Sequence, residues 1–367
     1  MLYLVFSVIL LLYFVVIIGA INGWNKKSVF AEKNNFSPTF SVIIAVRNEE
    51  KNCESLIKSL AKQDYPAQLF EVIIIDDHST DNTFSILQEL TKDLPNFIIK
   101  ESLEDSVGKK AAISLARTFA KNDFYIFTDG DCSFGNKWIS SYAKYITKEK
   151  DVFLFGAVNH VRENSFVQKL FTLDFLSMVG TQAGLAQNNH AFSCNAANMC
   201  ISRNIANLSS NNKFASGDDV FLLHSAKKTK KIPIVFVKEK DAMVYTNPPK
   251  DINHFLQQRI RWSSKSSGYT DFDSIYISSI VYITSASIFT VGITSIFLFQ
   301  FFWLFVFLLA SKTIIDLVFF SYILRFFGKN HLTLLSIPFQ LFYYIYITLI
   351  PIFALVSPLK WKGRKIS

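Results

Sequence analysis

Long apolar runs occupy both ends of the chain. Residues 2–21 carry no charge, and 20 residues are enough for a helix to cross a hydrocarbon core of about 30 Å. No basic residue precedes this run, so an uncleaved anchor is favoured over a signal peptide. A second apolar region extends from about Ile275 to about Ser357. It divides into three segments, near 275–297, 299–323 and 334–356, so the pattern predicts one membrane span before the central region and three after it.

The middle C-terminal segment carries two charged residues, Lys312 and Asp316. They are four positions apart, so they would face the same side of a helix and pair there. One interpretation is a polar contact inside a helix bundle. The other is a kinked or interfacial helix in place of a membrane span, and the sequence does not separate the two.

Strand-like and helix-like patterns alternate between the apolar ends. Short runs rich in β-branched residues predict strands, and the stretches between them predict helices. Alternation with short links is typical of an α/β domain with a mostly parallel sheet. The predicted strands are Phe40–Val46, Glu71–Ile75, Asn96–Lys100 and Asp123–Thr128, and the predicted helices cover about 48–62, 82–91 and 108–121.

Polar clusters follow three of these strands at the points where they end. The clusters are Arg47-Asn48-Glu49, Asp76-Asp77 and Asp129-Gly130-Asp131. Ligands bind beyond the carboxyl ends of strands in such sheets, so we expect one shared site. Asp129 and Asp131 supply hard oxygen ligands, which Mg²⁺ or Mn²⁺ takes together with water and substrate phosphates. The alternative is a solvent-facing turn, because an isolated Asp-x-Asp is common.

Composition and charge favour a membrane protein. Half of the residues are hydrophobic and only 18% are charged, whereas soluble domains are nearer a quarter charged. The net charge of +9 is associated with basic residues beside the apolar segments, which indicates contact with lipid head groups and not with nucleic acid. These residues are Lys26, Lys27, Arg325, Lys329, Lys360, Lys362, Arg364 and Lys365.

The four cysteines form no CxxC pair, which indicates free thiols in a reducing compartment and places the central domain in the cytosol. This placement creates a conflict. One span before the domain and three after it would put the basic C-terminal tail on the far side of the membrane, against the usual bias. Either one apolar segment does not cross, or the bias fails here.

Several familiar sites are absent from the sequence. No GxGxxG follows a strand, no HExxH occurs, and Gly108-Lys109 is followed by Lys110 where a Walker loop has Ser or Thr. The histidines at 78, 160, 190 and 224 are scattered without paired spacing, so we interpret them as ordinary core or surface side chains.

Seven short motifs, in order, resemble those of the membrane-associated family 2 glycosyltransferases with the GT-A fold. They are SVIIAVRNEE, VIIIDDHSTDNT, GKKAAI, DGD, NAANMCISR, SGDDVFL and QRIRW. The resemblance covers nearly the whole central domain, and QxxRW after an acidic pair is its most specific part. The chain has Ala45 where the family often has Pro, and Asp218-Asp219 where many members have Glu-Asp.

The resemblance implies a role for each motif. It implies that SVIIAVRNEE, VIIIDDHSTDNT, GKKAAI, DGD and QRIRW contact the nucleotide-sugar donor. It also implies that DGD binds the metal, that NAANMCISR lies on the acceptor side and that SGDDVFL carries the catalytic base. The implied donor residues are Arg47, Glu49, Asp76, Asp77, Lys109, Asp129, Gln258, Arg261 and Trp262; the metal ligands are Asp129 and Asp131; the acceptor-side residues are Asn198 and Met199; and the base is Asp219.

This assignment predicts a single-displacement reaction. A nucleotide-diphosphate sugar loses its diphosphate, whose charge is neutralised by Mg²⁺ or Mn²⁺ with help from Lys109 and Arg261. Asp219 takes the proton of the attacking hydroxyl, and displacement from the opposite face inverts the anomeric centre. The simpler interpretation of Asp218-Asp219 is a helix start with one acid as its cap, and both roles can coexist.

The stretch HFLQQRIRWSSK predicts a helix with two possible functions. Phe255, Ile260 and Trp262 can lie against a membrane surface with the basic residues at head groups. Together with the other motifs, we expect this interfacial helix also to close the active site, with Trp262 near the acceptor.

The predicted organisation is an anchor at 1–24, a GT-A domain at 25–273, a bundle of about three spans at 274–357 and a basic tail at 358–367. We expect an integral, multi-pass protein of the inner or plasma membrane that transfers a sugar to a lipid-linked or glycan acceptor. The alternatives are a processive polysaccharide synthase, for which three later spans are few, and a non-catalytic nucleotide-sugar sensor. A transporter is disfavoured because the charged residues gather outside the apolar segments.

Overall fold

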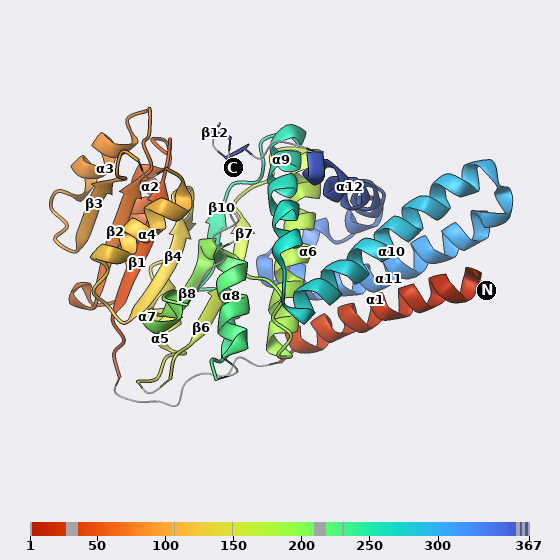
Figure 1. Ribbon diagram of the computed structural model, residues 1–367, viewed down its shortest axis with the longest axis horizontal. Coiled ribbons are helices and arrows are strands. Elements are labelled where there is room, and N and C mark those ends of the chain that lie inside the picture. The colour runs from red at the N-terminus through yellow and green to blue at the C-terminus, as the bar shows by residue number, and fades with distance from the viewer. Residues whose placement is uncertain are drawn as a thin grey trace.

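The computed structural model describes residues 2–26, 36–105, 107–148, 150–208, 218–229, 231–356, 360–361 and 364–365. It consists of an α/β domain and a group of long apolar helices beside it (Figure 1). The α/β domain is built on a seven-stranded sheet with the order β3-β2-β1-β4-β8-β6-β9. The strands are β1 (Phe40–Val46), β2 (Phe70–Asp76), β3 (Phe97–Glu101), β4 (Phe124–Asp129), β6 (Phe153–Gly156), β8 (Met199–Ser202) and β9 (Ile234–Val237).

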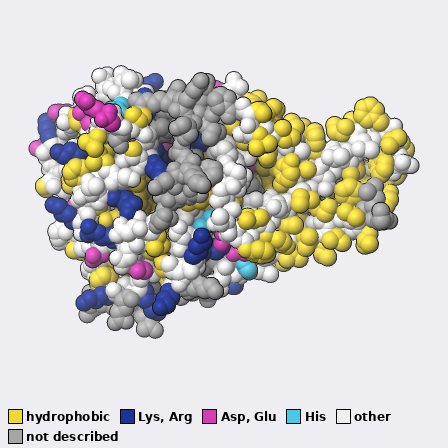
Figure 2. All heavy atoms as spheres, in the orientation of Figure 1, with side chains coloured by type: hydrophobic (Ala, Val, Ile, Leu, Met, Phe, Trp, Pro, Cys, Tyr) yellow, Lys and Arg dark blue, Asp and Glu magenta, His cyan; other side chains and the backbone are white. Residues whose placement is uncertain are grey.

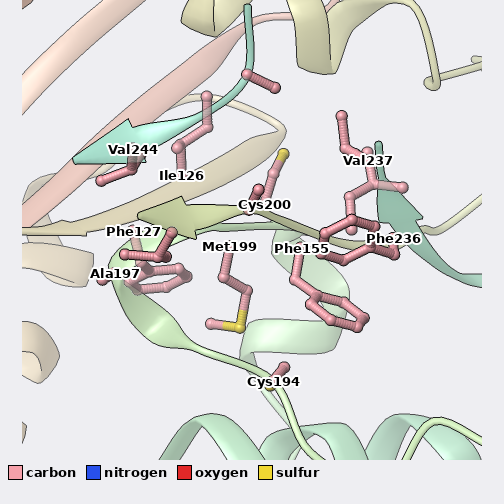
Figure 3. Close-up of a cluster of buried hydrophobic side chains, with 14 of the residues drawn as sticks. Ile126, Phe127, Phe155, Cys194, Ala197, Met199, Cys200, Phe236, Val237 and Val244 are labelled. Carbon is pink, nitrogen blue, oxygen red and sulfur yellow. The ribbon is translucent and has the colours of Figure 1, made fainter. Parts of the chain in front are cut away.

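The sheet is mostly parallel, as the sequence predicted. Strand β1 pairs in parallel with β2 and β4, and β2 pairs in parallel with β3. Strand β8 runs antiparallel to both of its neighbours, β4 and β6. The middle of the sheet is buried on both faces, and Figure 3 shows Phe155, Met199 and Phe236 packed together beside β8. All four cysteines are buried free thiols, in agreement with the sequence.

Helices cover the sheet, and a small second sheet extends it. The helices of this domain are α2 (Cys53–Ala61), α3 (Thr83–Thr91), α4 (Lys109–Phe119), α5 (Trp138–Ala143), α6 (Phe166–Gln187), α7 (Arg203–Ala206), α8 (Asp218–Lys228) and α9 (Ile252–Ser263). The second sheet has the order β5-β10-β7, from Ser133–Phe134, Val244–Thr246 and Val158–His160. A short pair of strands, β11 (Lys360–Trp361) and β12 (Arg364–Lys365), follows the last helix.

Helix α2 begins five residues later than expected, because Asn48 belongs to a loop. Asn48 has a left-handed backbone with φ of 51°. Its backbone N–H donates to Ser79 Oγ at 2.9 Å, and its side-chain oxygen accepts from the N–H of Thr80 at 2.8 Å. The two loops that follow β1 and β2 are therefore joined before the helix starts.

Four described helices are long and apolar enough to cross a membrane, by length and composition. They are α1 (Leu2–Trp24), α10 (Phe272–Phe297), α11 (Phe302–Phe327) and α12 (Ser336–Val356). Helices α1, α10 and α11 lie side by side and extend away from the sheet (Figure 1). Hydrophobic side chains dominate the surface of this extension, whereas charged side chains gather over the α/β domain (Figure 2).

The predicted pairing of Lys312 with Asp316 is confirmed, and α11 is one uninterrupted helix around it. Lys312 Nζ lies 2.6 Å from Asp316 Oδ2 and donates to Gln340 Oε1 of α12 at 3.2 Å. Tyr13 of α1 donates to Asp316 Oδ1 at 2.7 Å. This buried polar cluster joins three of the apolar helices, as polar groups in helix bundles commonly do.

Helices α1 and α6 cross at unusually close range through small residues. A Cβ added to Gly184 of α6 would collide with the carbonyl group of Ala20 in α1, and one added to Gly23 would collide with the carbonyl of Gly184. Asn188 closes the contact by donating to the carbonyl oxygen of Gly19 at 2.6 Å. The first apolar helix is therefore docked directly on the α/β domain.

Candidate active site

The three polar clusters lie at one edge of the sheet, as the sequence predicted. Strand β1 lies between β2 and β4, and the pairing register places Val46 opposite Asp76 and Ala45 opposite Asp129. All three strands are parallel, so their carboxyl ends meet there. The loops after these strands form the floor of the candidate site.

Arg47 and Asp77 connect the first two loops. The Arg47 guanidinium is buried and donates to the carbonyl oxygens of Asp77 and His78, at 2.6 and 2.7 Å. The Asp77 carboxylate accepts from the N–H of Gly108 at 2.9 Å, at the start of α4. Gly108 has φ of 104°, a conformation that side chains with a Cβ rarely adopt. The residue after it, Lys109, is thereby aimed along the sheet edge.

Glu49 and Asp76 serve the same loops through local hydrogen bonds. Glu49 is buried, and its carboxylate accepts from the Asn52 side chain at 2.6 Å. Asp76 is also buried, and it accepts from the N–H of Ser79 at 2.9 Å and from the Ser79 hydroxyl at 2.5 Å. The carboxylates of both residues therefore shape the loops around the site.

The Asp129-Gly130-Asp131 turn packs tightly on the loop after β1. A Cβ at Gly130 would lie 2.8 Å from Cγ1 of Val46 and 3.1 Å from Cγ of Glu49, so only glycine fits without displacement. Asp129 pairs with the Lys109 ammonium. Asp131 accepts from the hydroxyl of Thr246 at 3.1 Å.

Burial alone would lower the pKa of Lys109. The Asp129 carboxylate and the charge of Asp219 outweigh it and raise that pKa above its ordinary value. Lys109 is therefore a permanent positive charge at this edge.

Helix α8 brings its acidic first turn to the same edge. Asp219 Oδ2 accepts from the N–H of Ala196 at 3.3 Å, and Lys265 Nζ lies 3.8 Å from Asp219 Oδ1. Asp218 pairs with Lys110 at 3.1 Å. Burial raises the pKa of Asp218, with a smaller contribution from Asp219, while Lys110 opposes the rise. A helix N-terminus stabilises the negative charges gathered there.

Helix α9 adds a second positive charge to the site, that of Arg261. Burial lowers the pKa of Arg261, and the negative charges of Asp129 and Asp219 act in the opposite direction. Asp219 and Arg261 likewise act on Lys109. The charges of Asp129 and Asp219 therefore act on both cations, Lys109 and Arg261.

Arg259, two residues before Arg261, fixes α9 to its surroundings. It pairs with Asp174 of α6, and both side chains are 8% exposed. Its guanidinium also stacks over Trp262, 4.2 Å from the ring centroid. Trp262 is partly buried against Phe175, with the ring centroids 6.4 Å apart.

The prediction that Phe255 lies against a membrane surface is wrong. Phe255 is fully buried, stacked on Phe171 of α6 with centroids 4.3 Å apart and in edge contact with Tyr346 of α12 at 5.2 Å. Ile260 is partly buried beside the same cluster. The apolar face of α9 therefore packs on protein, which the sequence cannot distinguish from lipid.

The side chains of Asn198 and Met199 are buried inside the fold. The Asn198 amide donates to the carbonyl oxygens of Ala157 and Ala242, each at 2.8 Å. Its oxygen accepts from Trp138 at 2.9 Å and from Tyr142 at 2.7 Å. All four hydrogen-bonding positions are used within the fold, and Met199 is buried in β8 (Figure 3).

The carboxylate oxygens of Asp129 and Asp131 are suitable ligands for a hard divalent cation. Both are carboxylates on one tight turn, and Mg²⁺ or Mn²⁺ commonly takes one or two such ligands with phosphate and water. No group of three or more His, Cys, Asp or Glu side chains able to hold a metal occurs among the described residues. The site therefore fits a cation that is shared with a substrate, and not a closed protein cage.

Three polar residues of the site were missed from the sequence. Lys265 approaches Asp219, Thr246 approaches Asp131, and Lys110 pairs with Asp218. Lys265 lies four residues after Arg261, so helical spacing gave a signal for it. Thr246 had none, because β10 reaches Asp131 only through the fold.

Comparison with known proteins agrees with this geometry. A model described as Glycosyl transferase family 2 matches residues 41–206. The poly(ribitol-phosphate) beta-N-acetylglucosaminyltransferase TarS of Staphylococcus aureus is 31% identical over 132 residues, which are 36% of this chain and 23% of TarS. A beta-monoglucosyldiacylglycerol synthase of Nostoc sp. is 29% identical over 130 residues, or 35% of this chain and 28% of the synthase. The chain spans about a quarter of the length of these curated relatives.

One solved structure shares the fold over almost its whole length. The mannosyltransferase PcManGT from Pyrobaculum calidifontis, solved with GDP-Man and Mn²⁺, superimposes with a TM-score of 0.60 at 16% identity. The match covers 97% of this chain and 99% of PcManGT. The α/β part of the chain therefore matches the glycosyltransferase family 2 model over residues 41–206 and has the GT-A fold, and four long apolar helices accompany it.

Proposed function

We propose that the protein transfers a sugar from a nucleotide-diphosphate sugar to a hydroxyl of a membrane-associated, lipid-linked acceptor, with inversion at the anomeric carbon. The observation that carries the proposal is the group of charged side chains at the sheet edge, where Lys109 pairs with Asp129 and Lys265 Nζ lies 3.8 Å from Asp219 Oδ1. Two cations beside two acids suit a reaction in which an anion departs while a proton is removed.

Each step is assigned to residues of this chain. The acceptor oxygen bonds to the anomeric carbon as the bond from that carbon to the diphosphate oxygen breaks, and the electron pair leaves with the diphosphate. The acceptor proton passes to the Asp219 carboxylate. Lys109 and Arg261 stabilise the charge that develops on the diphosphate.

The donor is held by the loops after β1, β2 and β4. The nucleotide pocket is shaped by Arg47, Glu49, Asp76 and Asp77. Asp76 or Asp77 contacts the nucleotide base. Asp129 and Asp131 would hold Mg²⁺ or Mn²⁺, which supplies Lewis acidity at the departing diphosphate when bound. PcManGT, which has the same fold, was solved with GDP-Man and Mn²⁺.

The acceptor side is assigned to α9 and the apolar helices. Gln258, Arg261 and Trp262 lie on a helix that packs against α12, so the site opens beside the membrane segments. The Nostoc relative is a diacylglycerol glycolipid synthase and TarS acts on a ribitol-phosphate polymer. We place the α/β domain on the cytosolic side, where nucleotide sugars and reduced cysteines occur.

Donor turnover by the full chain in detergent tests the proposal. UDP-, GDP- and dTDP-sugars are supplied with EDTA, Mg²⁺ or Mn²⁺, and NMR reports the anomeric configuration of the product. We expect metal-dependent turnover of one donor class, with loss of at least 100-fold in Asp219→Asn and Asp131→Asn. Asp241→Asn, at an exposed acid outside the site, is the matched control.

The other outcomes are distinct. Donor binding without turnover at any metal concentration would identify a nucleotide-sugar sensor and overturn the proposal. Long products on a gel would identify a processive synthase. Trp262→Ala should lose transfer while the protein stays in the membrane; full transfer with loss of membrane attachment would remove Trp262 from the site.

A further inference from the structure

The last apolar helix, α12, does not follow the other three. Helices α1, α10 and α11 extend together away from the sheet, whereas α12 is seen nearly along its own axis beside α6 and α9 (Figure 1). Phe342 and Tyr346 lie in one aromatic cluster with Phe171 of α6 and Phe255 of α9. The Tyr346 hydroxyl donates to Asp174 of α6.

The contact with the α/β domain continues over two turns of α12. Phe342, Tyr346 and Ile350 all lie in the cluster of Phe171 and Phe255. Phe342 and Ile350 are separated by about 12 Å of helix, more than a third of the thickness of a hydrocarbon core. A helix that crossed the membrane would leave the α/β domain over that distance.

The two helices that pack against α12, α6 and α9, have exposed polar residues at their N-termini, which we expect to contact water. Helix α6 starts beside the exposed Ser165 and Asn164, and α9 starts with the exposed residues Asp251 and His254. These are the ends of α6 and α9 that lie near Val167 and Leu256, which pack on the cluster that contains Ile350. The C-terminal half of α12 is therefore at the level of the aqueous domain.

One face of α12 remains exposed, and it is apolar. Ile337, Leu341, Ile345 and Ile352 are between 46% and 56% exposed and recur at helical spacing. The opposite face buries Phe339, Tyr346 and Ile350 against protein. This exposed apolar face can contact lipid while the opposite face packs on protein.

The occupant of that face is the bilayer itself. Helix α12 contacts α10 and α11 of the extension, whose surface is dominated by hydrophobic side chains (Figure 2). Four basic residues follow α12 in the sequence, at positions 360, 362, 364 and 365, and they suit anionic head groups at the same surface.

We propose that α12 lies lengthwise on the membrane surface, so that the chain crosses the membrane three times, through α1, α10 and α11. The basic tail then stays on the same side as the α/β domain. The conflict between the number of apolar segments and the position of the positive charges disappears, because one apolar segment does not cross. This inference is independent of the proposed sugar transfer.

The sidedness of single cysteines tests the inference. Ser367→Cys marks the tail, Lys92→Cys marks α3 of the α/β domain, and Gln300→Cys marks the turn between α10 and α11. The native cysteines are all buried, so they contribute little labelling. Sealed inside-out and right-side-out vesicles are treated with a membrane-impermeant maleimide. We expect the tail and α3 to be labelled from one side and the α10–α11 turn from the other; labelling of the tail together with that turn would overturn the inference.

A depth measurement gives a second test that does not depend on the tail. Spin labels at Ile337→Cys, Ile345→Cys and Ile352→Cys, in the full protein in vesicles of phosphatidylcholine and phosphatidylglycerol, report depth from the surface. A surface helix gives three similar depths. A crossing helix gives depths that change steadily by about 22 Å from 337 to 352, and that result would overturn the inference.

Discussion

The ammonium of Lys265 lies 3.8 Å from Oδ1 of Asp219, and the two side chains are only 12% and 15% exposed. Lys265 belongs to the short 3₁₀ segment Ser264–Gly268 that follows α9. The helix that carries Arg261 therefore ends with a second cation beside the proposed base. Lys265 is a positioning residue for Asp219 in the proposed reaction.

Replacing Lys265 should slow the chemical step more than donor binding. Lys265→Met removes the charge that holds Asp219 near the end of α9, so we expect kcat to fall about tenfold, equivalent to about 1.4 kcal/mol, while the donor KM changes little. Lys265→Arg should recover most of the activity. Lys92→Met, at the exposed lysine directly after α3, is the control, and an equal loss there would remove the specific role of Lys265.

Breaking the buried ion pair of Arg259 and Asp174 should lower the free energy of unfolding by several kcal/mol. Asp174→Asn leaves the Arg259 guanidinium buried without its counter-ion, and Arg259→Met leaves Asp174 in the same condition. We expect each single variant to lose about 3–5 kcal/mol and the double variant to lose less than the sum. Thermal unfolding in detergent measures this, and strictly additive losses would mean that the two charges do not interact.

His160 should make the α/β domain sensitive to acid. Its ring is buried against Phe175, and burial lowers its pKa to about 3, with Arg259 and Lys329 acting in the same direction. The unfolded chain, with an ordinary pKa near 6.5, binds the proton first, so stability falls as the pH drops from about 6.5 towards 3. The slope approaches about 1.4 kcal/mol per pH unit.

The His160→Gln variant should lose this part of the pH dependence. His254→Gln, at an exposed histidine, should keep it. Unfolding temperatures measured between pH 7 and pH 4.5 compare the three proteins. Parallel curves for wild type and His160→Gln would contradict the assignment.

Adding a side chain at the centre of the α1–α6 crossing should destabilise the protein. Gly184→Ala would place a methyl group on the carbonyl of Ala20, so α1 must move away from α6. We expect a loss of about 2–4 kcal/mol and weaker attachment of α1, measured by thermal unfolding and by protease release of the α/β domain. Gly19→Ala is the matched control, because its added Cβ would lie 3.5 Å from Cδ2 of Leu185, an ordinary contact. Equal tolerance of both changes would show that the crossing is not tight.

The sheet and the acidic turns could be predicted because their signals are local. The β-branched runs of β1, β2 and β4 and the polar residues after them predict that Asp76 and Asp129 lie on one edge of the sheet. The pairing of Lys312 with Asp316 was also a local signal, since four residues make one helical turn.

The features that could not be predicted depend on tertiary contacts between segments that are far apart in the sequence. Phe255 was expected to face lipid, because an apolar side chain has the same pattern against lipid and against Phe171. Asn198 was expected near an acceptor, but its partners Trp138 and Ala242 come from distant parts of the chain. Thr246 reaches Asp131 across 115 residues of sequence, and no periodic pattern records such an approach.

The backbone contact between Gly184 and Ala20 has a mechanical consequence. Main-chain contact between two helices restricts their rocking, so α1 holds the α/β domain firmly. In the proposed membrane placement, the candidate site is then kept at a constant height above the lipid. The proposed acceptor would be selected first by how far its hydroxyl projects from the bilayer, before the shape of the pocket matters.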